Sequence, residues 1–178
     1  MKLFPSLLLF LSCLALSSGF LRADDPVVAN GDFSKGLEGW TLTMPESIGA
    51  RFEIVPDGYE GKPALKLVVG DTDADYWQGR ITVDAKFEPG ASYTMKVFLM
   101  SEPDDGSIET VAWGRSVADK KSTLYSDRTI VKPTQSWEEF TLQFTVDAEP
   151  KETYGVSFNN LARANRTTWI ANMTFTKD

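Results

Sequence analysis

The chain has 178 residues, with 18 lysines and arginines, 25 aspartates and glutamates, one cysteine and no histidine, which suits one folded domain. The lack of histidine excludes a Ser-His-Asp triad, a Cys-His dyad and a histidine-ligated zinc site. The formal net charge of −7 argues against nucleic acid as a partner, because phosphates favour a basic surface.

The N-terminal residues 1–23 predict an export signal. Lys2 supplies a short positive region, residues 3–16 form an apolar stretch, and Ala23 places a small residue at the cleavage point. The apolar stretch is shorter than the roughly 18 residues that a membrane span requires. We therefore expect a secreted or periplasmic protein with no membrane span, whose mature domain covers residues 24–178.

The single cysteine, Cys13, lies within this signal, so the mature domain would have no disulfide and would depend on its core. Cleavage would also remove Lys2 and Arg22 and no acidic residue, which leaves the mature domain more acidic than the whole chain. An uncleaved anchor and a lipoprotein signal that uses Cys13 are the alternatives to cleavage.

Beyond the signal, apolar and polar residues alternate with a period of two and break at turn residues. Short turns between the segments favour antiparallel pairing. We therefore predict one all-β domain, a β-sandwich jelly roll of roughly nine or ten antiparallel strands. The alternating segments cover residues 50–55, 64–69, 81–84, 93–100, 108–115, 123–131, 139–146, 154–159 and 168–176.

Alternation also predicts which side chains face the core. In segment 93–100 the apolar set comprises Tyr93, Met95, Val97 and Leu99, and in segment 139–146 it comprises Phe140, Leu142, Phe144 and Val146. The opposite face of segment 93–100 carries Phe98 beside Lys96. This pair suits a binding surface, or else Phe98 packs under a loop.

Five motifs follow one another in an order that suggests a family. They are Asn30-Gly31-Asp32-Phe33 with Gly39-Trp40, Trp77-Gln78-Gly79, Glu88-Pro89-Gly90 before Tyr93, Ser136-Trp137 before Phe140, and Trp169-Ile170-Ala171-Asn172. In this order they resemble the carbohydrate-binding modules of the family 4/9 type, the CenC-like modules with a galactose-binding-domain-like jelly roll. The resemblance covers nearly the whole mature chain.

This resemblance implies a module that binds a poly- or oligosaccharide on a concave sheet and does not cleave it. The apolar face of a sugar ring stacks on an aromatic side chain, while polar groups replace the water around its hydroxyls. Modules of this family usually accompany a larger enzyme, so we expect the protein either to act alone or to work with a separate glycan-degrading enzyme.

Two tryptophans are the main candidates for stacking. By resemblance Trp77 occupies the position of a sugar-stacking residue, and Trp113 shares a half-charged face with Arg115. Arg115 could donate two parallel hydrogen bonds to vicinal hydroxyls or to a uronate. The additional ligand-binding candidates are Gln78, Arg80, Lys96, Phe98 and Tyr125. Trp40, Trp137 and Trp169 are expected to pack structurally.

The acidity of the chain argues against uronate-rich or heavily sulfated glycans, unless Arg80, Lys96 and Arg115 form a local basic patch. The sequence otherwise leaves the identity of the glycan open.

The family resemblance also implies a structural calcium, and here the sequence departs from the pattern. Glu60 and Asp32 match expected ligand positions, whereas Ser34 and Ala171 stand where the family usually has acids. Calcium binds six to eight oxygens, so the loss of two carboxylates weakens the site. We expect no required cofactor, with a structural calcium as the alternative.

Two other kinds of function stay open. A small glycoside hydrolase or lyase needs only two carboxylates or a Tyr-Lys pair, but the acidic clusters at residues 71–75 and 102–105 have the character of hydrated turns. A structural or adhesive jelly roll would present an exposed apolar patch to another protein.

Overall fold

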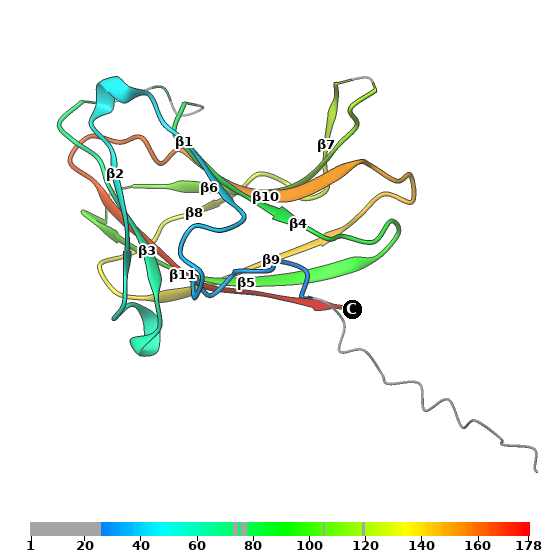
Figure 1. The fold of residues 1–178 in the computed structure, drawn as a ribbon, viewed down its shortest axis with the longest axis horizontal. Helices are drawn as coiled ribbons and strands as arrows, with labels where there is room; N and C mark the ends of the chain where they lie inside the picture. The colour runs from blue at the N-terminus through cyan, green and yellow to red at the C-terminus, as the bar shows by residue number, and fades with distance from the viewer. Residues whose placement is uncertain (1–25, 73–74, 76–77, 105, 119) are drawn as a thin grey trace, which may run out of the picture.

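The computed structural model describes residues 26–178, except residues 73–74, 76–77, 105 and 119. The expected signal, residues 1–23, therefore lies outside the described residues. Two antiparallel sheets pack face to face as a sandwich (Figure 1). The helical structure in the described part of the chain is confined to two 3-10 turns, η1 (Glu46–Ile48) and η2 (Tyr59–Gly61).

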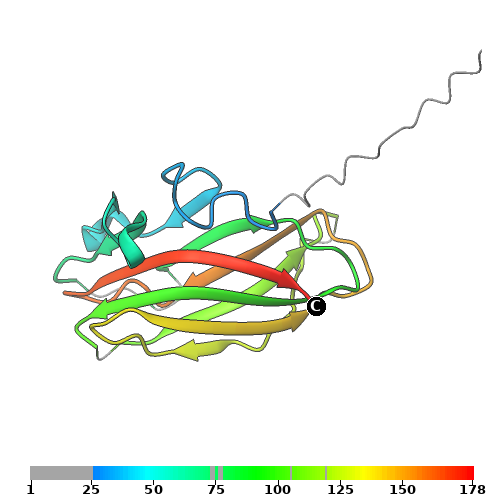
Figure 2. The same cartoon turned by 90° about the horizontal axis from the view of Figure 1, so that it is seen from below.

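The two sheets bring together strands that are distant in the sequence. Sheet A has the order β1 (Trp40–Thr43), β4 (Arg80–Ala85), β10 (Thr153–Asn159), β6 (Ile108–Arg115) and β7 (Ser122–Leu124), and β8 (Thr129–Val131) also pairs with β6. Sheet B has the order β2 (Arg51–Val55), β3 (Ala64–Val68), β11 (Thr167–Lys177), β5 (Ser92–Glu102) and β9 (Glu138–Thr145). Figure 2 shows β11 in red, β5 in green and β9 in yellow running side by side.

The predicted all-β sandwich is confirmed, with two differences in its strands. The described residues form eleven strands, because the short edge strand β1 was not expected and segment 123–131 divides into β7 and β8. The division occurs at Tyr125, whose side chain is buried inside the sandwich. There the Tyr125 amide donates to the Ala112 carbonyl at 2.9 Å, and the Ala112 amide donates to Ser126 Oγ at 3.1 Å.

The core contains the side chains that alternation placed there. The four inward residues of β5 are at most 1% exposed, and Leu142 and Phe144 of β9 are also buried. Phe140, which was expected inside, is only partly buried, because it lies near the end of its strand. Phe87 contacts the rings of Tyr93, Phe144, Tyr154 and Phe175 at one end of the sandwich.

The Asn30 side chain holds the opening loop closed on itself. Its Nδ2 donates to the carbonyls of Gly36 and Glu38 at 2.9 and 3.0 Å, and its Oδ1 accepts from the Lys35 amide at 3.0 Å. Trp40 donates its indole N–H to the Asn30 carbonyl at 2.9 Å and is buried, so its predicted structural role is confirmed.

Candidate functional site

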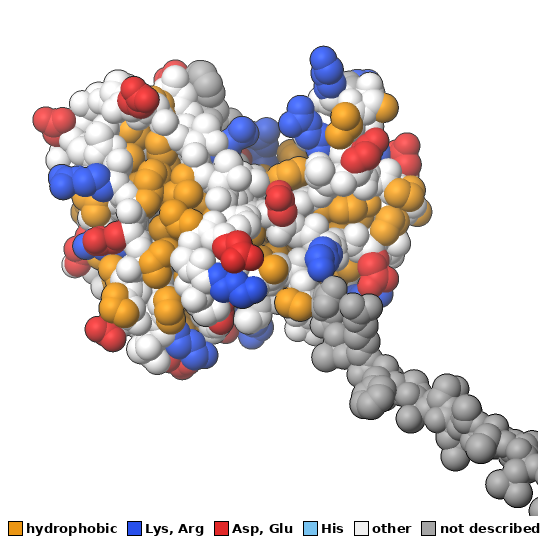
Figure 3. All heavy atoms as spheres, in the orientation of Figure 1, with side chains coloured by type: hydrophobic (Ala, Val, Ile, Leu, Met, Phe, Trp, Pro, Cys, Tyr) orange, Lys and Arg blue, Asp and Glu red, His pale blue; other side chains and the backbone are white. Residues whose placement is uncertain are grey.

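The outward face of sheet A carries an open groove of about 340 Å³. Side chains two residues apart on one strand share a face, so the register of the strands determines which residues meet here. Figure 3 shows that the molecule is hollowed at the top of the view, with lysine and arginine side chains beside the hollow. The groove is lined by Thr41, Thr43, Arg80, Thr82, Glu109, Val111, Trp113, Arg115, Ser122, Leu124, Arg128, Ser157 and Asn159.

Trp113 of β6 forms the aromatic part of the groove floor. Its backbone partner on β10 is Gly155, where an added Cβ would lie 2.6 Å from Cζ2 of the indole. The ring therefore occupies space that only a glycine leaves open. The indole N–H donates to Ser157 Oγ at 2.8 Å, which fixes the direction of the ring. The half-buried ring is thus held in one orientation beside an open groove.

Polar side chains surround this ring along the floor. Ser157 Oγ and Thr82 Oγ1 lie 3.3 Å apart and share a hydrogen bond, and Asn159 Nδ2 donates to Glu109 Oε1 at 3.0 Å. These groups are mutually oriented before any ligand arrives. Fixed donors and acceptors can replace water around ligand hydroxyls at a smaller entropic cost than mobile side chains.

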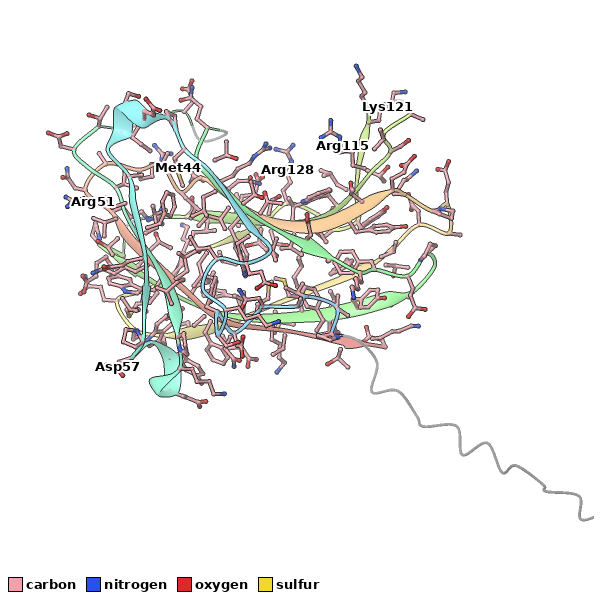
Figure 4. The ribbon with its side chains drawn as sticks, viewed as in Figure 1. Met44, Arg51, Asp57, Arg115, Lys121 and Arg128 are labelled. Atoms are coloured by element: carbon pink, nitrogen blue, oxygen red, sulfur yellow. The ribbon has the colours of Figure 1, made fainter. Side chains whose placement is uncertain are left out.

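Three arginines enter the groove from different strands and loops. Arg80 comes from β4, Arg115 from the end of β6, and Arg128 from the segment before β8. In Figure 4, Arg115 and Arg128 project from the sheet toward the open side of the molecule. Arg128 Nη1 lies 3.7 Å from Glu109 Oε2. No ion pair of Arg80 or Arg115 occurs within the described ranges of the chain.

The structure brings three of the predicted site residues together. Trp113, Arg115 and Arg80 all line the groove. Gln78 lines an adjoining hollow that shares Thr43 and Arg80 with the groove, and its Oε1 accepts from the Asp75 amide at 3.1 Å. Trp77 lies outside the described residues, so its role stays a prediction.

The other three predicted ligand-binding residues lie away from the groove. Lys96 and Phe98 belong to the outer face of sheet B, where Lys96 Nζ is 2.9 Å from Glu139 Oε1. Phe98 stacks on Tyr59 of η2 with ring centroids 3.7 Å apart, so it packs under a turn. Tyr125 is buried beneath β6, where its hydroxyl would collide with any Cβ at Gly114.

The burial of Tyr125 has an electrostatic consequence. Burial, together with the nearby Tyr154, Asp147 and Glu149, raises the pKa of the Tyr125 phenol to about 12. Its hydroxyl has no hydrogen-bond partner within the described residues. Tyr125 is therefore a core residue that supports the groove strand from below.

The other two tryptophans expected to pack structurally lie on the sheet B side and are only half-buried. Trp137 contacts Tyr59 edge-on at 5.9 Å, and Lys66 Nζ lies 6.0 Å from the ring centroid of Trp169. Neither ring lines the groove.

The two carboxylates suggested for calcium do not gather a ligand set. Asp32 Oδ1 accepts from the amide and hydroxyl of Ser34 at 3.1 and 2.8 Å, and these hydrogen bonds lower the pKa of Asp32. Lys62 lies close enough to Asp32 to lower its pKa further. Among the described residues, no group of three or more Asp, Glu or Cys side chains is placed to hold a metal ion. Asp32 and Glu60 thus do not fit a calcium site on their own, and a bound calcium stays a prediction.

Several groove residues were not candidates from the sequence. Arg128, Asn159, Ser157 and Thr41 come from segments that only the sheet order places beside Trp113. The one available signal was alternation within segment 154–159, which puts Ser157 and Asn159 on the same face.

A jelly-roll sandwich with an oriented tryptophan and fixed polar groups in an open groove defines a ligand-binding module. The sequence of residues 25–161 matches the model of the carbohydrate-binding domain family CBM_4_9. The chain therefore belongs to this family of carbohydrate-binding domains, and the family resemblance read from the sequence is confirmed. No helix that the structure describes is long and apolar enough to cross a membrane.

Solved structures share the fold at low sequence identity. A CBM4 module has a TM-score of 0.64 and 19% identity, over 87% of this chain and 96% of its own. A family 16 carbohydrate-binding module has a TM-score of 0.62 and 16% identity, over 84% and 99%. The CBM22-2 xylan-binding domain of Paenibacillus barcinonensis Xyn10C has a TM-score of 0.58 and 14% identity, over 83% and 98%. The comparison with curated proteins finds no match.

Proposed function

We propose that this protein binds a poly- or oligosaccharide in the groove of sheet A and does not cleave it. The observation that carries the proposal is the oriented indole of Trp113, held by Ser157 at 2.8 Å and surrounded by hydroxyl and amide groups. The apolar face of a sugar ring can stack on this indole while the neighbouring groups hydrogen-bond its hydroxyls.

The acidic content of the groove supports a non-catalytic role. Hydrolysis of a glycosidic bond uses two carboxyl groups on either side of the bond. Glu109 is the one acidic residue among the described residues that line the groove. Its two oxygens are already engaged, since Asn159 Nδ2 donates to Oε1 at 3.0 Å and Arg128 Nη1 lies 3.7 Å from Oε2.

The proposal includes export to the periplasm or the outside of the cell. Its support is the pattern of residues 1–23, a positive start followed by an apolar stretch and a small residue. A secreted glycan-binding module would act beside a separate glycan-degrading enzyme. The mass of the protein recovered after export tests cleavage, since cleavage after Ala23 gives a mature chain that starts at Asp24.

The exported protein would be run through native gels that contain xylan, β-glucan, laminarin, cellulose derivatives or alginate. We expect at least one glycan to retard it, and Trp113→Ala to abolish the retardation while the circular dichroism spectrum is unchanged. Trp169→Ala is the matched control, because this half-buried tryptophan lies on sheet B and outside the groove.

Retardation that survives Trp113→Ala would place binding outside the groove. No retardation in any gel by a folded wild type, or release of reducing ends from a glycan, would contradict a non-catalytic sugar-binding module.

A further inference from the structure

The groove has the opposite charge to the molecule that carries it. The whole chain has a formal net charge of −7, whereas the groove lining contains three arginines and one glutamate. Asp84, farther along β4, is the backbone partner of Gly155 and lines a separate hollow that also includes Lys86. A cleft lined mainly by one sign of charge attracts ligands of the opposite sign.

The arginines lie on both sides of the tryptophan. Arg115 is two residues beyond Trp113 on β6, about 7 Å along the strand. At the other end of the groove, Arg80 on β4 and Glu109 on β6 are both backbone partners of Asn159 on β10. Arg128 Nη1 lies 3.7 Å from Glu109 Oε2. The seven residues from Glu109 to Arg115 are separated by six strand steps, so the groove extends about 20 Å. Positive charge thus flanks the aromatic surface instead of sitting at one end.

The chemistry of arginine matches a planar anion more closely than a neutral sugar. A guanidinium donates two parallel hydrogen bonds to a carboxylate, and these charge-assisted bonds are stronger than those to a hydroxyl. Neutral sugars are recognised by hydroxyl and amide groups, and the floor already provides these from Ser157, Thr82 and Asn159. The arginines are a separate recognition element.

We propose that the groove selects polysaccharides whose rings carry carboxylates, with a ring stacked on Trp113 and carboxylates held by Arg115 on one side and Arg80 on the other. This inference rests on the proposed function of the same groove. The expectation from overall charge disfavoured uronate-rich glycans unless a local basic patch existed. Arg80 and Arg115 share such a patch, with Arg128 in the place expected for Lys96.

The test compares a polyuronate with the same polymer after chemical reduction of its carboxyl groups, which removes the charge and keeps the backbone. The full exported protein should bind the polyuronate at least about tenfold more tightly than the reduced polymer. Arg115→Ala and Arg80→Ala should each weaken binding of the polyuronate by a larger factor than binding of the reduced polymer, so that most of the difference between the two polymers is lost. Raising salt from about 50 to about 500 mM should weaken only the polyuronate complex.

The control variant is Arg51→Ala, which removes one exposed positive charge from β2 on sheet B, outside the groove lining (Figure 4). It should bind both polymers as the wild type does. Arg115→Lys keeps the charge but loses the paired donors, so an intermediate loss is expected if the carboxylate is held by two hydrogen bonds.

Equal affinity for the charged and reduced polymers would overturn the inference while the proposed function stands. Equal or tighter binding of polyglutamate or of a sulfated polymer would overturn it too, because the groove would then recognise charge and not a carboxylated sugar. Failure of every glycan, charged or neutral, to bind in a Trp113-dependent way would instead overturn the proposed function.

Discussion

The packing of Trp113 on Gly155 yields a substitution whose effect follows from the geometry. In Gly155→Ala the new Cβ would lie 2.6 Å from Cζ2 and 3.0 Å from Cε2 of the indole, and 2.6 Å from the Val83 carbonyl oxygen. These contacts are too short, so the ring must leave its place and the strand pair must shift. The hydrogen bond from the indole to Ser157 would be lengthened or lost.

Two opposing contributions set the size of the effect. Overpacking a tight site costs about 1–3 kcal/mol, while alanine reduces the freedom of the unfolded chain and stabilises by about 0.4–1 kcal/mol. We expect a net decrease of about 1–2 kcal/mol in the free energy of unfolding, measured by urea denaturation with an unchanged m-value. Affinity for the glycan that the wild type binds should fall at least about tenfold.

A double-mutant cycle with Trp113→Ala separates the contact of the new Cβ with the indole from its contact with the Val83 carbonyl oxygen. In the Trp113→Ala background, Gly155→Ala should be less destabilising by about 0.5–1.5 kcal/mol. The destabilisation that remains reports the contact with the Val83 carbonyl. Strictly additive effects on stability, or a glycan affinity that Gly155→Ala leaves intact, would refute the orientation of the ring described above.

Two further predictions concern the frame around the groove. Asn30→Ala removes three hydrogen bonds within the opening loop and should lower the free energy of unfolding, measured in urea, by about 2–4 kcal/mol. A loss below about 1 kcal/mol, the contribution of one ordinary hydrogen bond, would show that other contacts hold the loop. For Tyr125, the folded state raises the pKa from 10.0 to about 12, so the stability that this group contributes is complete below pH 10 and is lost as the pH rises to 12. Tyr125→Phe should therefore lose less stability than the wild type across this interval in denaturation at stepped pH, and equal losses would contradict a buried neutral phenol.

Local alternation predicted most of the fold because each sheet has one buried face. The inward residues of β5 were identified correctly, since a shift of one residue would expose all four of them. Alternation failed where it was short or interrupted. Strand β1 has only four residues after a glycine turn, and Tyr125 turns inward between β7 and β8 and breaks the pattern.

The candidate site was predictable along one strand but not across the sheet. Trp113 and Arg115 were found together because they alternate on β6. Asn159 was missed because β10 pairs between β4 and β6, and Arg128 because it precedes β8, which pairs with β6; these long-range pairings are contained in no local pattern. For Phe98, the sequence could not decide between binding and packing, because the turn that brings Tyr59 over it lies about forty residues away in the chain.

The strand order also determines when the molecule can fold. The central strand of sheet B, β11, is the last strand of the chain, and the central strand of sheet A, β10, is the one before it. Before residues 153–177 are available, β4 has no partner toward β6, and β3 has none toward β5. Contacts of such long sequence separation form slowly. The sandwich therefore stays open until residues 153–177 have been synthesised, and an open polypeptide can still be threaded through a narrow channel.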